Sequence, residues 1–477
     1  MIKYFSVSIA FSLFVLIAAA QQTKPEFPFT IRLEQMEINN MPALQSFAYA
    51  TWQGKWLMIG GRKDGLHRRQ PWATFDEEGQ NRFIYVVDPQ NKKVWKQMLE
   101  KLPTPVIEQL QSTNMGFCQT GNRLFLTGGY GYSKTADDHI TFPYLTVIKV
   151  DELITAMLNN KDISNSIVQI KDERMAVTGG RLAKLRDTFL LAGGQRFDGR
   201  YNPHGPDHGP GFKQEYTNEI RKFTIEYDKD SPLIKNYSAI KDSINLHRRD
   251  YNLVPQVFKN NELGYTMFSG VFQYNQDIPF TNFVDIAGGT YKVNNSFEQK
   301  FSHYHTAVMP MYDKVAASMY AIFFGGIARY FPGSNGKIFD NTDVPFTKTI
   351  SVVIRKDEKE KEIFLPIQMP GYLGAAAEFI FMPDARMYME GIADAGSVLN
   401  EENLIGYIVG GINSSANNIF FDNTGKESKA SSKIIKVFIK KPAGNFLFNS
   451  ISIHSTIFYL PEFPSFLNSL LFKNNRQ

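Results

Sequence analysis

The chain has 477 residues, of which 43% are hydrophobic and 21% are charged, so it can bury a large core and is not globally disordered. Its formal net charge is only +5 and is spread along the chain, which excludes the basic patch of a nucleic-acid-binding protein. Aromatic residues reach 14%, and aromatic side chains favour β-strands.

Residues 1–20 differ from the rest of the chain. Lys3 gives a short positive start, a mostly apolar run extends from Phe5 to Ile17, and small residues precede Gln21. This order is typical of a cleaved secretory signal peptide. A membrane anchor is the alternative, but the run is short for a bilayer span, which needs roughly 20 apolar residues. We therefore predict a secreted or periplasmic protein with no membrane span after cleavage.

The sequence contains a single cysteine, Cys118, so no intrachain disulfide can form. An exported protein of this size without disulfides depends on its hydrophobic core, which favours a bacterial envelope protein over a eukaryotic secreted one. We expect a monomer without a cofactor.

An apolar run that ends in a glycine pair recurs along the chain. Before each pair lies a second strand-like run, and after it comes a further β-branched or aromatic strand. Five pairs are clear and a sixth is degenerate: Gly60–Gly61, Gly128–Gly129, Gly193–Gly194, Ser269–Gly270, Gly325–Gly326 and Gly410–Gly411. A small antiparallel sheet cannot bury both of its faces alone, but sheets that stack radially around a common axis bury them against one another. The sequence therefore predicts an all-β protein, a six-bladed β-propeller with antiparallel four-stranded blades over residues 21–445.

The glycine pairs are expected where a strand ends close to neighbouring backbone and needs a positive φ. Gly288–Gly289 is predicted to be a turn within the fourth blade. Residues 29–33 alternate in polarity and are well placed to close the last blade, although residues 450–459 of the tail 446–477 compete for that place. The alternating charge run of residues 355–362 is predicted to be a solvated hairpin tip.

These units resemble the kelch repeat, whose blade carries an apolar run, Gly-Gly and then a spaced Tyr and Trp. The first unit matches most fully, with Gly60–Gly61, Tyr85 and Trp95. The chain is also similar to exported bacterial kelch proteins that often carry a C-terminal sorting domain for type IX secretion. Only a short tail follows Pro442, too small for such a domain. The resemblance implies the fold and leaves the function open.

Two histidine clusters are candidate sites. His204, Asp207 and His208 lie in a Gly- and Pro-rich loop and could hold a metal ion. A surface loop with solvated histidines is the favoured alternative, because the spacing matches no standard ligand motif. His303 and His305 would face the same side of a strand at the start of the fifth blade, near the central channel. There they would be ligands, an acid–base pair or a polar lining of the channel.

Arginines recur at equivalent places in the repeats. Three follow glycine pairs, two flank the start of the third blade, and one belongs to a charged cluster that opens the fourth: Arg62, Arg196 and Arg329; Arg181 and Arg186; His247, Arg249 and Asp250. If their loops share one face, they form a cationic basin suited to a carboxylate, a sulfate or an acidic sugar. The alternative is that each arginine pairs locally with an acid.

Our leading hypothesis is an exported ligand-recognition module that binds a glycan or a protein partner on the propeller face. The alternative is a periplasmic sugar-modifying enzyme, in which Arg186 or Arg249 holds a carboxylate. Six-bladed kelch proteins include sialic acid mutarotases, which act through Arg and Glu in the central cavity. Copper-radical oxidases also use a kelch propeller, but their additional domains are absent here. A scaffold in an envelope complex is the third possibility.

Overall fold

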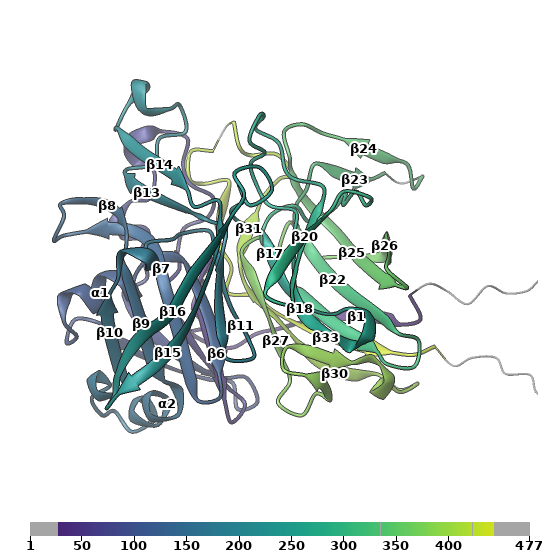
Figure 1. Ribbon diagram of the computed structural model, residues 1–477, viewed down its shortest axis with the longest axis horizontal. Coiled ribbons are helices and arrows are strands. Elements are labelled where there is room, and N and C mark those ends of the chain that lie inside the picture. The colour runs from purple at the N-terminus through teal and green to yellow at the C-terminus, as the bar shows by residue number, and fades with distance from the viewer. Residues whose placement is uncertain (1–26, 334, 422, 443–477) are drawn as a thin grey trace, which may run out of the picture. The chain divides into compact units, whose positions relative to one another are not determined.

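The structure is a computed structural model that describes residues 27–442, except positions 334 and 422. The described residues form six antiparallel four-stranded blades, and they contain two α-helices, α1 (Thr104–Leu110) and α2 (Val150–Leu158) (Figure 1). The predicted six-bladed all-β propeller is therefore confirmed. None of the described helices is long and apolar enough to cross a membrane. The predicted signal peptide and the tail segment 450–459 lie outside the described residues.

Each blade is a consecutive antiparallel sheet whose strands run from the centre outwards. The first three blades are β2 (Ala48–Trp52), β3 (Lys55–Ile59), β4 (Phe83–Asp88) and β5 (Lys93–Met98); β6 (Thr113–Thr120), β7 (Arg123–Ser133), β9 (Tyr144–Lys149) and β10 (Ile167–Lys171); and β11 (Arg181–Leu185), β12 (Thr188–Ala192), β15 (Glu219–Asp228) and β16 (Ser231–Lys241).

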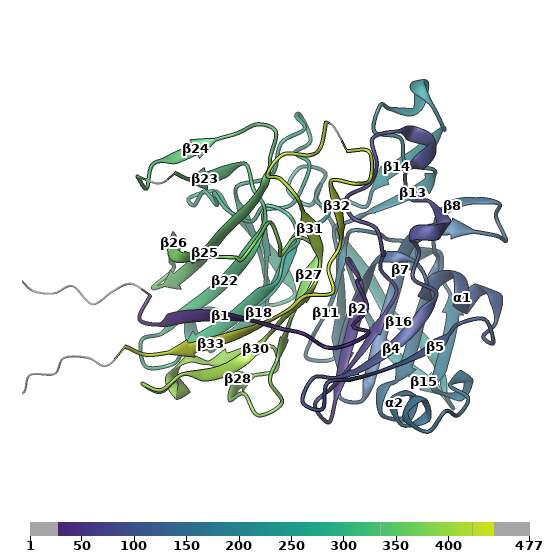
Figure 2. The same cartoon turned by 180° about the vertical axis from the view of Figure 1, so that it is seen from behind.

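The next two blades are β17 (Asn252–Val257), β18 (Leu263–Phe268), β19 (Phe283–Ala287) and β20 (Thr290–Asn294); and β21 (Val308–Asp313), β22 (Ser318–Ile327), β25 (Phe346–Lys356) and β26 (Lys359–Gln368). The sixth blade is β27 (Ala377–Phe381), β30 (Asn403–Gly410), β33 (Ile434–Lys440) and β1 (Thr30–Met36). Its outermost strand comes from the N-terminal part of the chain, because β1 pairs with β33 from Thr30 opposite Lys440 to Met36 opposite Ile434 (Figure 2).

The core lies between the blades, as radial stacking requires. A separate apolar cluster fills each of the six interfaces between neighbouring blades. Representative members of each cluster, one residue from each of the two blades, are Leu57 and Leu124, Phe125 and Phe189, Leu190 and Met267, Phe268 and Phe323, Phe324 and Phe379, and Val409 and Trp56. Burying a side chain of this size contributes about 1.5–3 kcal/mol, so the packing of blade on blade supplies most of the stabilisation.

The glycine pairs lie at the end of the second strand in four blades and within the longer second strands β7 and β22 in the other two. Both residues of every pair have positive φ, including Ser269 at 52° and Gly270 at 97°. At Gly128 a Cβ atom would lie 1.8 Å from the carbonyl oxygen of Val177, in the segment leading to the next blade. The predicted need for positive φ and close backbone approach is thus confirmed. Gly288–Gly289 forms the turn between β19 and β20, as predicted.

Short hairpins extend the glycine-pair end of four blades. They follow the second strand in the second, third, fifth and sixth blades: β8 (Asp138–Thr141) against β7, β13 (Gln195–Gly199) with β14 (Phe212–Tyr216), β23 (Tyr330–Pro332) with β24 (Ile338–Asp340), and β31 (Ile412–Ser414) with β32 (Ser428–Ala430). Figures 1 and 2 show β13, β14, β23 and β24 at the same end of the blades. A further hairpin, β28 (Met387–Met389) with β29 (Ile392–Asp394), adds to the inner edge of the fifth blade.

The charge run 355–362 forms the predicted hairpin, with positive φ at Asp357 and Glu358 in the turn between β25 and β26. The run is not solvated throughout, however. Arg355 is buried and donates to both carboxylate oxygens of Asp285, at 2.8 and 3.0 Å, and to Glu360 at 3.0 Å. The strands on either side of the turn therefore hold charged groups inside the protein, where they are paired.

Candidate functional site

A cavity of about 560 Å³ opens at the glycine-pair end of the central channel. We call it the glycine-pair cavity. All six blades contribute to its wall, mostly through residues that follow a glycine pair or precede the innermost strand: Arg62, Asn114, Thr178, Arg249, Tyr304 and Ala376, in blade order. A site at the convergence of all the blades is the usual kind of concave ligand site.

The opposite end of the channel holds a second cavity of about 570 Å³. We call it the opposite cavity. The innermost strand of every blade lines it: Tyr49, Gln119, Arg181, Pro255, Val308 and Phe379 are examples. His305 lines both cavities and so marks the place where they approach each other.

The candidate arginines do not share one basin. Arg62 and Arg249 line the glycine-pair cavity, whereas Arg181 and Arg186 line the opposite cavity. Arg196 and Arg329 belong to neither cavity wall. The separation has a simple cause, since Arg186 lies in the turn at the far end of β11 and each strand residue advances about 3.3 Å along the channel.

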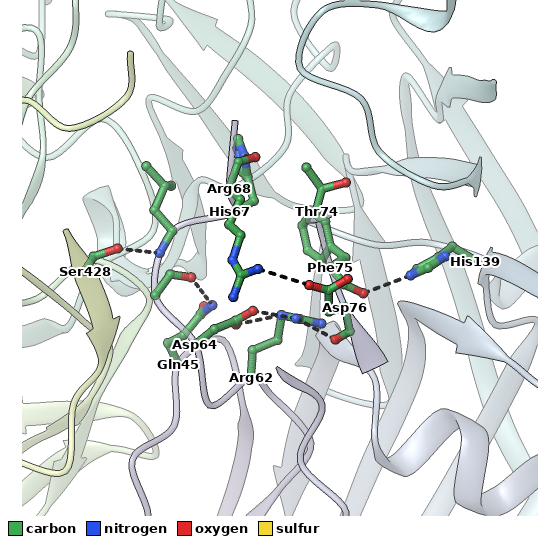
Figure 3. Close-up of polar contacts among 12 residues, drawn as sticks. Gln45, Arg62, Asp64, His67, Arg68, Thr74, Phe75, Asp76, His139 and Ser428 are labelled. Carbon is green, nitrogen blue, oxygen red and sulfur yellow. Dashed lines mark hydrogen bonds and ion pairs between the residues drawn. The ribbon is translucent and has the colours of Figure 1, made fainter. Parts of the chain in front are cut away.

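Three of these arginines donate hydrogen bonds to carboxylates. Arg62 is buried and donates to both oxygens of Asp64, at 2.7 and 2.5 Å (Figure 3). Two other arginines are paired in the same manner: Arg196 with Asp198 at 2.7 Å and Glu173 at 3.0 Å, and Arg329 with Asp340 at 2.6 and 2.7 Å. Local pairing, the alternative considered from the sequence, therefore describes this group.

Arg249 is different. Its Nε donates to the hydroxyl of Tyr216 at 3.0 Å, and its nearest carboxylate is that of Asp250, 3.9 Å away. The ring of Phe272 lies 5.2 Å from the guanidinium carbon, and only 14% of the side chain is exposed. Within the described residues, neither Nη group has a hydrogen-bond acceptor. Arg249 therefore offers open donors at a cavity wall, the arrangement that recognises a planar anion.

The two histidines of the 303–305 segment face different surroundings, contrary to the expected alternation. The segment is not a strand, because β21 begins only at Val308. Its backbone bonds to neighbouring segments instead, from His303 to Ile327 and from His305 to Asp250. His303 is completely buried; its Nδ1 accepts from the Arg329 N–H at 3.0 Å and its Nε2 donates to the Gln299 carbonyl at 3.0 Å. Burial lowers its pKa to about 4, so it is a neutral structural residue.

His305 faces the channel and contacts two charged groups from other blades. Its Nε2 lies 3.2 Å from Oε1 of Glu378, and the same oxygen lies 4.0 Å from Nη1 of Arg181. That oxygen is buried and makes no hydrogen bond of good geometry within the described residues. Burial lowers the pKa of His305, the Arg181 charge lowers it further, and Glu378 opposes the shift. The three side chains form a polar cluster on the wall of the opposite cavity, and His305 also lines the glycine-pair cavity.

The remaining candidates lie outside the cavities. His247 stacks on Tyr216, with ring centroids 3.7 Å apart, and its Nδ1 is 2.9 Å from Oδ1 of Asn218. His204, Asp207 and His208 are exposed in the loop between β13 and β14. In the part of the chain that the structure describes, no three His, Cys, Asp or Glu side chains are grouped to hold a metal ion.

Aromatic residues, which the sequence analysis did not single out, form much of the cavity wall: Phe75, Tyr130, Phe197, Tyr201, Phe272, Tyr304 and Phe420. His67 packs among them, edge to face with Tyr201 at 4.8 Å, and burial lowers its pKa to about 4. A signal was present for some of them, since Tyr130 and Phe197 directly or closely follow glycine pairs. Glu378 was missed because no local motif surrounds it.

Comparisons with known proteins were made for sequence and for fold. No protein-family model matches the chain, and no curated protein matches it in sequence. Solved structures do match in fold. One of them, described as the structure of YjhT, is 10% identical with a TM-score of 0.46, over 85% of this chain and 99% of that one. This likeness carries no argument about ligand or reaction, and membership of the kelch family stays a resemblance.

Proposed function

We propose that this protein is an exported ligand-recognition propeller that binds a carboxylate-bearing sugar of a glycan in the glycine-pair cavity. The observation that carries the proposal is Arg249, whose guanidinium has open donors at a largely buried wall. A charged donor held this way is stabilised when an anionic ligand supplies the missing acceptors. The arginines Arg62, Arg196 and Arg329 already have carboxylate acceptors and require none from a ligand.

The rest of the cavity suits a sugar. Its volume of about 560 Å³ falls within the range of small-molecule sites, and its walls combine aromatic rings with a few polar groups. Aromatic faces pack against the C–H faces of sugar rings, while Asp250 and Thr178 offer partners for hydroxyl groups. Because burial lowers the pKa of both His67 and His305, these imidazoles are neutral at pH 7 and add no cation to Arg249.

Calorimetric titration with galacturonic acid, N-acetylneuraminic acid and galactose tests the proposal. We expect at least one acid to bind and galactose to bind more weakly. Arg249→Ala should weaken the acid at least tenfold, since a hydrogen-bonded charge contributes about 1.5–3 kcal/mol. Arg249→Lys should not restore full affinity, because an ammonium lacks the planar fork.

Arg186→Ala is the matched control, because it removes an exposed arginine at the opposite cavity. Loss of binding in Arg186→Ala with retention in Arg249→Ala would contradict the proposed site. No binding of any sugar would contradict the proposal itself and favour a protein-binding scaffold.

A second candidate is an enzyme that interconverts the anomers of an acidic sugar. The observation that favours it is the cluster of His305, Glu378 and Arg181 in the opposite cavity, in which His305 also lines the glycine-pair cavity. In ring opening, a base takes the proton of the anomeric hydroxyl, the bond from the anomeric carbon to the ring oxygen breaks, and an acid protonates that oxygen. The Glu378 carboxylate would take the first proton and, as the carboxylic acid so formed, return it to the ring oxygen, while the neutral His305 orients Glu378 through Nε2.

NMR exchange spectroscopy separates this enzyme from the binding module. An enzyme must accelerate the exchange between anomers, and Glu378→Gln must abolish the acceleration while Arg186→Ala retains it. Unchanged exchange in the presence of a bound sugar would leave the binding module as the function.

A further inference from the structure

We infer that the ligand is a glycan chain whose acidic unit enters the glycine-pair cavity while further units lie across three exposed aromatic residues at its rim. We call Trp72, Tyr274 and Phe421 the rim aromatics. The inference rests on the proposed function and names its ligand class, an acidic oligosaccharide or polysaccharide instead of a free sugar.

The rim aromatics are exposed and lie in loops that line the glycine-pair cavity. Their exposed fractions are 69% for Trp72, 62% for Tyr274 and 56% for Phe421. Each lies in a loop that also builds the cavity wall: Trp72 between Arg69 and Phe75, Tyr274 between Phe272 and Asp277, and Phe421 as a wall residue itself. Single exposed apolar residues are common, but three large rings around one mouth indicate a binding surface.

The loop that carries Trp72 is held firmly. Thr74 donates to the carbonyls of Pro71, at 3.0 Å, and of Tyr201, and Arg200 donates to the Thr74 carbonyl at 2.8 Å. Next along the loop, His139 contacts the Phe75 carbonyl at 2.9 Å (Figure 3). An indole exposed on a loop fastened from other blades is already ordered, so stacking on it costs little conformational entropy.

Tyr274 is connected to the proposed carboxylate anchor by a continuous series of contacts. Its ring meets His247 edge to face at 5.4 Å, His247 stacks on Tyr216 at 3.7 Å, and Tyr216 accepts from Arg249 at 3.0 Å. These packed rings, which lie outside the cavity wall, hold Tyr274 in place relative to Arg249, so a chain held by Arg249 at its acidic end can continue towards Tyr274.

Phe421 borders the cavity on the side of the sixth blade. The guanidinium of Arg69 lies 5.3 Å from its ring centroid. Asn423 donates to the carbonyls of Leu66, at 3.0 Å, and of His67, at 2.7 Å, so the loops of the first and sixth blades are joined there. Arg69 also adds a second cation at the rim, where a further acidic unit would be favoured.

A chain fits these observations better than a folded protein does. A protein surface resting on the rim would leave the Nη groups of Arg249 inside the cavity without acceptors. A chain end can enter the cavity and meet them, while sugar rings outside it cover the exposed aromatic faces. An acidic extended peptide can also enter, and it is the competing ligand in the test.

The test is calorimetry with galacturonic acid and its α-1,4-linked trimer and hexamer. We expect the trimer to bind at least tenfold more tightly than the monomer. Trp72→Ala or Tyr274→Ala should remove most of that gain and leave the affinity for the monomer within twofold. Tyr227→Ala is the matched control, because Tyr227 is also exposed but lines none of the cavities described above.

Each other result overturns a distinct claim. If the monomer binds through Arg249 and longer chains gain nothing, the inference fails while the proposed function stands. If galacturonic acid, its chains and N-acetylneuraminic acid all fail to bind, the proposed function fails. If a hexaglutamate peptide binds more tightly than the hexamer and depends on both Arg249 and Trp72, the ligand class is wrong.

Discussion

Arg248 and Arg249 are adjacent in the chain, but the guanidinium of Arg248 has hydrogen-bond acceptors and both Nη groups of Arg249 lack them within the described residues. Arg248 is 0% exposed and donates to the carbonyls of Asn245, Ser269 and Asn282 at 2.7–2.9 Å. No carboxylate is within salt-bridge distance of it in the described residues, and burial lowers its pKa to about 9. It ties the entry of the fourth blade to the strands beside it, whereas Arg249 points its open donors at the cavity.

This contrast predicts separable effects on stability and binding. Arg248→Met should destabilise the protein by about 3 kcal/mol, because it leaves several buried carbonyls without donors. Its affinity for an acidic sugar should stay within a few-fold of the wild type. Arg249→Ala should show the reverse, with a small change in the urea midpoint and a large loss of affinity. Equal destabilisation by the two substitutions would contradict the division of roles.

Glu362 predicts a pH dependence of stability. Its carboxylate accepts the backbone N–H of Lys300 at 2.6 Å and of Phe301 at 3.2 Å, and burial raises its pKa to about 8. The folded state therefore binds a proton more tightly than the unfolded state, so the stability contributed by Glu362 is full below about pH 4.5 and is lost as the pH rises through 8.

Glu362→Gln should accordingly stabilise the protein relative to wild type above pH 8, by about 1–3 kcal/mol. At pH 5 it should be neutral or slightly destabilising. Urea unfolding between pH 5 and pH 9 measures the difference. A stability difference that does not change over this range would show that Glu362 is already ionised in the folded protein.

At the scale of the element, the glycine pair is the recurring feature of the blade that requires a particular residue type. Two separate constraints meet at Gly128, a φ of +63° and the approach of a Cβ to within 1.8 Å of the Val177 carbonyl oxygen. Gly289, in the turn between β19 and β20, has a φ of +80° and no atom within 4 Å of a Cβ. The two glycines thus differ in the free space around the Cβ position but share the same type of backbone conformation.

Alanine at the two positions should separate the constraints. Gly289→Ala should cost about 1 kcal/mol for the left-handed backbone alone. Gly128→Ala should cost several kcal/mol, because the backbone of the approach to the third blade must move as well. Thermal unfolding of both variants measures this. Similar losses would mean that conformation alone, and not the packing of neighbouring backbone, requires the glycine pair.

The sequence was sufficient to predict the blades because each glycine pair is a local requirement that recurs. Two arginine pairings could also be predicted from the sequence. Arg62 and Asp64, like Arg196 and Asp198, are two residues apart in extended chain, so their side chains lie on the same face. The pairing of Arg329 with Asp340 and the cluster of His305, Glu378 and Arg181 could not be predicted from the sequence. They depend on which residues of distant segments meet, and no local pattern encodes that.

At the scale of the whole molecule, the channel has two chemically different mouths. The glycine-pair cavity combines aromatic walls with the guanidinium groups of Arg249 and Arg69, neither of which donates a hydrogen bond to a carboxylate within the described residues. The opposite cavity has Arg181, Lys184 and Arg186 from one strand and its turn, and Glu378 and Glu390 line the same space. Both cavities hold cations, so the affinity of the wild-type protein alone does not show which cavity the ligand occupies.

A crystal structure of the protein soaked with the tightest-binding acidic sugar is therefore the most direct test of the account. We predict density in the glycine-pair cavity, with the sugar carboxylate within hydrogen-bonding distance of both Nη groups of Arg249 and a ring face against the aromatic wall. A sugar bound in the opposite cavity, against Arg181 or Arg186, with the glycine-pair cavity free of ligand, would contradict it.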